Sequence, residues 1–286
     1  MKKYAIIIIL VLVTISISFN YSCKNEDDNR DTLAVYNKTT AEESIIAVDV
    51  YNQIFDIVLI SSDKTDAKSI NTECPSITFE PTTGYPKTLN CDFGIGCTYN
   101  EHTVSGSISA ILSDRIRNQG TTISVTLTNF KIDTVEVSGT ITMSVTEANV
   151  LTSGIITLTA TIDNAVITTN DKNFSFDTDL TISWNLNGLT DYTDDEISIT
   201  QLSMTGVNSD NKTFNIEVEE ALVFSVSCKE ITTGIFSATT SESNFPFSVD
   251  FGNGVCDGMA TITTTIQVQI GNKIIEEEYS YEIELP

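Results

Sequence analysis

The sequence predicts a mainly β protein, an antiparallel meander arranged as a curved sheet or a sandwich, with one buried N-terminal α-helix. Three observations predict this fold. Most of the chain alternates apolar and hydroxyl side chains with a period of two, turn-forming residues separate these segments, and a long apolar segment without Gly or Pro precedes them. With 286 residues, 41% of them apolar, the chain is long enough to form one large domain.

The first 22 residues are predicted to be a signal peptide. Met1-Lys2-Lys3 is positively charged, and the apolar run over residues 5–19 is short for a membrane span and typical of a signal. The run ends in Asn20-Tyr21-Ser22-Cys23, which resembles a bacterial lipoprotein signal, in which Cys23 is acylated and becomes the N-terminus. Asn20 stands where the usual motif has Leu. A plain secretory signal and an uncleaved anchor helix are the alternatives.

Residues 23–38 are predicted to form a disordered acidic tether. Lys24-Asn25-Glu26-Asp27-Asp28-Asn29 is too polar to fold by burial. Its position after Cys23 resembles the signal that exports lipoproteins of the Bacteroidota to the outer face of the outer membrane. An ordinary solvated linker is the alternative.

A single domain over residues 39–286 is expected to begin with a helix over residues 40–62. Thr40-Ala41-Glu42-Glu43 has the form of a capping box, and the following segment is apolar on nearly every side. Such a helix is buried, which in a β protein indicates a curved sheet wrapped around it. A pair of long strands is the alternative for this segment.

From Cys74 onward, the sequence predicts antiparallel strands with one buried and one solvent-facing side. The alternation is clear in residues 122–128, 135–146, 182–186, 214–226 and 279–285. Trp184 shares the parity of its apolar neighbours, which favours the core over an exposed sugar-binding platform.

An internal repeat predicts the cysteine pairing. The segment from Cys74 to Asp92-Phe93-Gly94-Ile95-Gly96-Cys97 recurs from Cys228 to Asp250-Phe251-Gly252-Asn253-Gly254-Val255-Cys256. A turn signal lies midway in each interval, so each interval is expected to be a hairpin whose ends meet, as a disulfide requires. We therefore expect the disulfides Cys74–Cys97 and Cys228–Cys256, with Cys91 as a buried free thiol. Cys91–Cys97, with Cys74 free, is the alternative.

Several motifs together resemble a family of Bacteroidota surface lipoproteins to which no activity is assigned. The motifs are Tyr85-Pro86-Lys87-Thr88, Asp92-Phe93-Gly94, Gly96-Cys97-Thr98, Val104-Ser105-Gly106-Ser107-Ile108, Asn129-Phe130, Val137-Ser138-Gly139-Thr140, Ser227-Cys228-Lys229 and Asp250-Phe251-Gly252-Asn253-Gly254 with Cys256-Asp257. The resemblance covers most of the chain after Cys23, but its motifs are turns and cystines. Asp31-Thr32-Leu33 is also similar to the O-glycosylation sequon of these bacteria, which implies Thr32 as an acceptor.

The charge and the motifs exclude several functional classes. A net charge of −24 and only three Arg argue against nucleic acid, phosphate clamps and an electrostatic hold on anionic lipid. One His disfavours histidine catalysis and multi-His metal sites, and Asp92 and Asp250 are interpreted as caps of Gly turns. We expect no catalytic residue, no cofactor and no metal.

Three functions are compatible with these features. The leading one is a non-enzymatic envelope lipoprotein, inserted in the outer membrane through acylated (palmitoylated) Cys23 and exposed at the cell surface as a binding or structural scaffold. Its protein or glycan partner is not predicted. The alternatives are a carrier of an apolar ligand between sheet and helix, and a glycan hydrolase with two carboxylates in a cleft.

Overall fold

The computed structural model describes residues 30–64, 69–70, 74–170, 172–187, 192–270 and 273–285. Within this part, a helix and fourteen strands form one unit, and each strand pairs antiparallel with the next in sequence. The elements are α2 (Arg30–Asp63), β1 (Ser69–Ile70), β2 (Ser76–Glu80), β3 (Lys87–Tyr99), β4 (His102–Leu112), β5 (Thr122–Ile132), β6 (Val135–Asn149), β7 (Ile155–Thr169), β8 (Lys172–Asn185), β9 (Glu196–Val207), β10 (Thr213–Ser225), β11 (Glu230–Thr240), β12 (Phe247–Asn253), β13 (Met259–Ile270) and β14 (Lys273–Glu284). The predicted mainly β meander with one N-terminal helix is confirmed. It is one open sheet, with β1 and β14 at its edges, rather than a sandwich.

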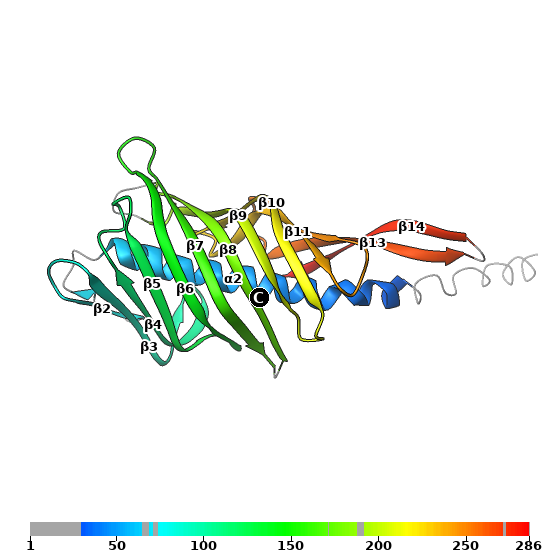
Figure 1. Cartoon of the computed structure of the whole chain (residues 1–286), viewed down its shortest axis with the longest axis horizontal. Helices are drawn as coiled ribbons and strands as arrows, with labels where there is room; N and C mark the ends of the chain where they lie inside the picture. The colour runs from blue at the N-terminus through cyan, green and yellow to red at the C-terminus, as the bar shows by residue number, and fades with distance from the viewer. Residues whose placement is uncertain are drawn as a thin grey trace, which may run out of the picture.

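The sheet curves around α2, and its strands follow the helix axis in order. In Figure 1, α2 runs lengthwise beneath strands that cross it obliquely, with β2–β5 near its C-terminal end and β13–β14 near its N-terminal end. Hydrogen bonds show the same progression. They join Asp56 to Tyr99 of β3, Tyr51 to the Ser138 carbonyl of β6, and Asn37 to Thr264 of β13. The predicted buried helix inside a curved sheet is therefore confirmed.

The helix begins ten residues before the predicted start at residue 40. Residues 30–38 of the predicted disordered tether lie in α2, so that prediction was wrong for them. The expected cap was wrong as well, because Thr40 and Glu43 lie inside the helix and contact the β9–β10 turn. Asn208 Nδ2 donates to Thr40 Oγ1 (2.9 Å), and the Ser209 amide donates to Glu43 (3.1 Å). The Thr40 and Glu43 side chains, which resembled a local helix cap, therefore accept hydrogen bonds from a turn that is distant in the sequence.

The helix supplies much of the apolar core. Within its span Asn37–Asp63, an 18-residue window has a mean hydropathy of 1.5, which by length and composition suits a membrane span, but 94% of that window is buried within the fold. The fully buried side chains include Ile54, Phe55, Val58 and Leu59. Burial of this apolar surface is the main force that holds sheet and helix together.

The strands alternate as the sequence predicts. In β8, for example, the side chains of Leu180, Ile182 and Trp184 are buried while their neighbours are partly exposed. Trp184 is fully buried, so its predicted core position is confirmed. Its indole N–H donates to Asp195 Oδ2 (2.9 Å).

Two glycines of the repeated Val-Ser-Gly motif let neighbouring chains approach closely. Gly106 has φ +82° at a bulge between β4 and β5, and a Cβ there would lie 2.3 Å from the Asn129 carbonyl oxygen. Gly139 has φ +146°, and a Cβ there would lie 3.2 Å from the Tyr51 hydroxyl. These motif glycines therefore set the curvature of the sheet and the fit of α2.

The cysteines pair as predicted. Cys74 is bonded to Cys97, and Cys228 to Cys256, with Cα–Cα distances of 5.9 and 5.5 Å. Cys91 is free and buried. The alternative pairing Cys91–Cys97 was wrong.

Candidate functional site

A buried polar stripe runs along the middle of α2. Asp49, Asn52, Gln53 and Asp56 follow the spacing of one helix face, and all four side chains are buried. Gln53 Nε2 donates to Asp49 Oδ2 (2.9 Å), and Asn52 Nδ2 donates to the Val48 carbonyl (2.9 Å). Polar groups removed from water in this way need partners inside the protein.

The turn between β3 and β4 supplies partners for Asp56. The Tyr99 hydroxyl and Asn100 Nδ2 both donate to Asp56 Oδ2, at 3.0 and 3.2 Å. Asn100 and Glu101 have φ of 48° and 73°, so this tight turn places the two donors over the helix. Asp56 Oδ1 and Asn52 Oδ1 remain buried without a hydrogen-bond partner.

A second turn, between β10 and β11, meets the first. Lys229 Nζ lies 2.7 Å from Glu101 Oε1, and the adjacent Cys228 belongs to a disulfide. His102 Nδ1 lies 2.7 Å from Asp133 Oδ2, which brings the β5–β6 turn to the same place. Three turns that are far apart in sequence thus gather around the polar stripe of α2.

Burial changes the acidity of the two stripe carboxyls. Desolvation raises the pKa of Asp49 to about 7, opposed by the hydrogen bond from Gln53 and by His102, while Glu230 adds to the rise. Desolvation raises the pKa of Asp56 to about 6, opposed by the hydrogen bonds from Tyr99 and Asn100. Both carboxyls are shielded from solvent, so they can hold or release a proton but do not face a solvent-exposed substrate.

A second polar cluster lies at the C-terminal end of α2. Arg117 forms a two-pronged ion pair with Asp63, with 2.6 Å between its Nε and Asp63 Oδ1, and the Tyr192 hydroxyl donates to Asp63 Oδ2 (2.9 Å). Asp195 binds Trp184 and the Asn187 amide, and desolvation raises the pKa of its carboxyl. These contacts tie the β4–β5 and β8–β9 loops to the end of the helix.

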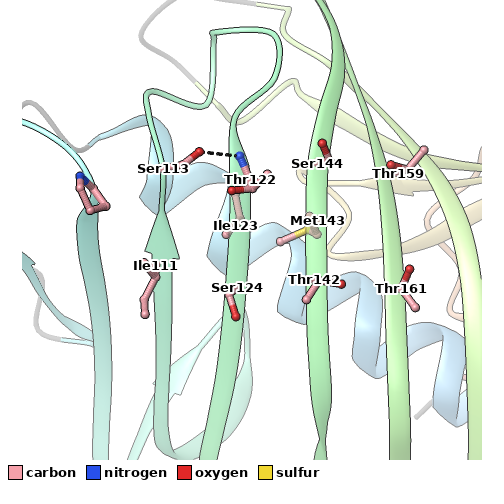
Figure 2. Close-up of a pocket in the computed structure, with 11 residues that line it drawn as sticks. Ile111, Ser113, Thr122, Ile123, Ser124, Thr142, Met143, Ser144, Thr159 and Thr161 are labelled. Carbon is pink, nitrogen blue, oxygen red and sulfur yellow. Dashed lines mark hydrogen bonds between the residues drawn. The ribbon is translucent and has the colours of Figure 1, made fainter.

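A shallow hollow of about 510 Å³ opens on the outer face of β4–β7. Hydroxyl side chains line it in cross-strand register, as with Ser124, Thr142 and Thr161, and Figure 2 shows them on neighbouring strands in front of the helix. Exposed Ile111 adds apolar surface, and none of the described residues that line the hollow carries a charge. The hollow therefore offers hydrogen-bond donors and acceptors but no charge that would attract a ligand of opposite charge.

The predicted site residues are only partly placed. Cys23 and the acidic residues 24–29 lie outside the described residues, and Thr32 lies on α2. Asp92 and Asp250 cap the glycines that follow them, as expected, because the Gly94 amide donates to Asp92 and the Gly252 amide to Asp250, both at 2.8 Å. The segments lie within β3 and β12, however, and the first forms a bulge rather than a turn at a strand end. Burial raises the pKa of the Cys91 thiol to about 11. Such a thiol is unreactive at neutral pH.

The polar stripe was not predicted from the sequence. Asp49, Asp56 and Asp63 recur every seven residues, which keeps them near one face of a helix. This spacing indicates a polar face on the helix, but the many apolar residues between the Asp residues make the pattern difficult to recognise. Among the residues that the structure describes, no group of three His, Cys, Asp or Glu side chains has a metal-binding arrangement.

Comparison of the chain with protein-family models, with curated proteins and with solved structures finds no match. Functional inference therefore depends on the residues and the geometry described above.

Proposed function

We propose that the chain is a non-enzymatic lipoprotein of the cell envelope, held in the outer membrane by acylated Cys23, whose helix-filled sheet serves at the cell surface as a binding or structural scaffold. The observation that carries the proposal is the pair of disulfides that close hairpins 74–97 and 228–256. Structural disulfides persist in oxidising compartments outside the cytoplasm. They fit the export signal that the first 23 residues resemble.

The position of α2 supports a short, direct link between anchor and domain. Seven residue steps separate Cys23 from Arg30, where the helix begins, and this length spans at most about 25 Å. The N-terminal end of α2 and the neighbouring β13 would then stay close to the bilayer. The helix, about 51 Å long for its 34 residues, would hold the rest of the sheet in a fixed frame.

The filled interior favours a scaffold over a carrier of an apolar ligand. A carrier needs a dry cavity of a few hundred Å³ between sheet and helix. Here Ile54, Phe55 and Val58 of α2 are fully buried where such a ligand would lie. The hollow over β4–β7 opens to solvent on the opposite face of the sheet (Figure 2).

The positions of the buried acids favour a scaffold over a glycan hydrolase. Hydrolysis of a glycan needs two carboxyls that reach the substrate from opposite sides. Asp49 and Asp56, whose pKa values are shifted furthest toward neutrality, are 3% and 0% exposed. A polymer does not reach either group in this arrangement.

Acyl labelling and surface proteolysis test the proposal. The full-length chain, produced in a cell that makes lipoproteins, is expected to incorporate a clickable palmitate analogue, and Cys23→Ala is expected to lose the label. Cys91→Ala is the matched control, which keeps it. Protease added to intact cells is expected to cleave the wild-type protein and to spare a variant with neutral residues at 24–29. A wild-type protein without label, or protected in both forms, would contradict the proposal.

A further inference from the structure

Two buried side-chain oxygen atoms on α2 lack a hydrogen-bond donor. Asn52 Oδ1 and Asp56 Oδ1 have no hydrogen-bond partner, although both residues are fully buried. Residues four apart are neighbours on one helix face, and the remaining polar atoms of both side chains already have partners. Because both oxygens are acceptors, a donor must lie between them, or both are left with the cost of an unmade hydrogen bond.

The charges around Asp56 do not supply that donor. Lys64, at the end of the helix, attracts a negative charge on Asp56, but its Nζ lies over the Tyr192 ring, 5.0 Å from the centroid. Asp195, before β9, repels the same charge, and β3 and the turn after it contribute the neutral groups Tyr99 and Asn100. In the described part of the chain, no ion pair includes Asp56.

We propose that, at mildly acidic pH, the Asp56 carboxyl of the folded protein is protonated on Oδ1 and donates this proton to Asn52 Oδ1. One proton then satisfies both orphan oxygens, while Asp56 Oδ2 continues to accept from Tyr99 and Asn100. The protonated side chain ties the core helix to the β3–β4 turn without a buried charge. The inference concerns the core and does not depend on the proposed function.

The arrangement makes the contact between helix and turn sensitive to pH. On ionisation the O–H bond of Asp56 breaks, the proton passes to water and the electron pair stays on Oδ1, beside the Asn52 oxygen. Desolvation raises the pKa of Asp56 from 3.8 to about 6, so this step falls between mildly acidic and neutral pH. In the unfolded chain Asp56 ionises near its ordinary value, so rising pH weakens the folded state until the folded pKa is passed.

Carboxyl NMR of the full-length protein tests the protonation directly. With ¹³C-labelled Asp, the Asp56 resonance, assigned by its loss in Asp56→Asn, is expected to titrate near pH 6 and to shift in Asn52→Leu. Titration below pH 4.5 would overturn the proposal. A high-resolution structure with a water or a cation between Asn52 Oδ1 and Asp56 Oδ1 would also overturn it.

Stability measurements give the second test. Asp56→Asn mimics the neutral acid, because its amide can donate to Asn52 while its oxygen accepts from Tyr99 and Asn100. Between pH 5 and pH 8, the wild-type folding equilibrium constant is expected to fall about tenfold more than that of Asp56→Asn. Asp49→Asn changes the other buried acid and is the control. It should keep the additional fall in the folding equilibrium constant that Asp56 causes. Equal falls in wild type and Asp56→Asn would contradict the proposal.

Discussion

Lys229 Nζ lies 2.7 Å from Glu101 Oε1, although 128 residues separate the two in sequence. The contact joins the tip of the β3–β4 hairpin to the tip of the β10–β11 hairpin. Both residues have positive φ, 63° for Lys229 and 73° for Glu101, so each stands at the apex of a tight turn. The sheet does not close through strand pairing, and this contact instead links two of its hairpin turns next to Asn100, which binds Asp56 of α2.

We expect Lys229→Gln to loosen the two turns without unfolding the domain. The Lys229 side chain is 32% exposed and that of Glu101 is 83% exposed, so solvent screens the pair and the unfolding midpoint should hardly change. Hydrogen exchange of the Asn100 and Glu101 amides should become faster. Lys131→Gln, which breaks the pair of Lys131 and Glu136 within one hairpin, is the control and should leave those amides unchanged. Unchanged exchange in Lys229→Gln would argue against a role of this ion pair in holding the two turns together.

The disulfide between Cys228 and Cys256 should contribute strongly to stability. It closes a loop of 28 residues, for which chain entropy predicts about 3–4 kcal/mol. The double variant Cys228→Ser, Cys256→Ser is expected to lose about this much unfolding free energy in urea titrations. In the same experiments, alkylation of unreduced, denatured wild-type protein should modify Cys91 while Cys74 and Cys97 stay protected. Modification of Cys74 would contradict the observed pairing.

The close approach at Gly106 should not tolerate a side chain. In Gly106→Ala the new Cβ would lie 2.3 Å from the Asn129 carbonyl oxygen, so β4 and β5 must separate in addition to the strain of a positive φ. Gly84→Ala is a matched control, because Gly84 has nearly the same φ and no atom within 4 Å of its Cβ position. Thermal unfolding should show a much lower midpoint for Gly106→Ala than for Gly84→Ala. Equal midpoints would mean that the close backbone contact at Gly106 does not affect the stability of the fold.

Local patterns were sufficient to predict most of the fold. Alternation along β8 gives the correct inward position of Trp184, and the repeated Cys-to-Cys segments, each with a turn signal midway, give the correct pairing of all four bonded cysteines. Each of these features depends on neighbours within a few residues or within one hairpin. The apolar character of α2 likewise predicts its burial without any knowledge of the strands that cover it.

The start of the helix and the polar stripe depend on distant residues. Thr40 resembles an N-cap only because its partner Asn208, 168 residues away, is not visible in the local sequence. Asp56 would resemble a solvent-facing acid, and its donors Tyr99 and Asn100 reach it only once the β3–β4 turn folds over the helix. Short polar side chains suit caps, surfaces and buried contacts alike, so sequence alone does not distinguish these roles.

Asp49 should make the folded protein less stable as the pH rises. Desolvation raises its pKa from 3.8 to about 7, so the folded chain keeps a proton that the unfolded chain releases near pH 4. The unfolding free energy should therefore fall from about pH 4 to about pH 7 and change little above that range. Asp49→Asn keeps a side-chain oxygen that can accept from Gln53 but carries no charge at any pH. The variant should thus be more stable than wild type at pH 8, by up to roughly 4 kcal/mol.

Urea titrations at pH 4, 6 and 8 measure this difference. Wild type and Asp49→Asn should have similar unfolding free energies at pH 4 and diverge as the pH rises. Asp114→Asn is the control with the opposite sign, because hydrogen bonds from Asn118 and the Arg115 amide lower the pKa of this exposed carboxyl. Its removal should cause a small loss of stability above pH 4. A finding that Asp49→Asn is no more stable than wild type at pH 8 would contradict the prediction. That result would mean that burial does not destabilise the ionised Asp49 carboxylate, because the hydrogen bond from Gln53 and the nearby His102 compensate for its loss of solvation.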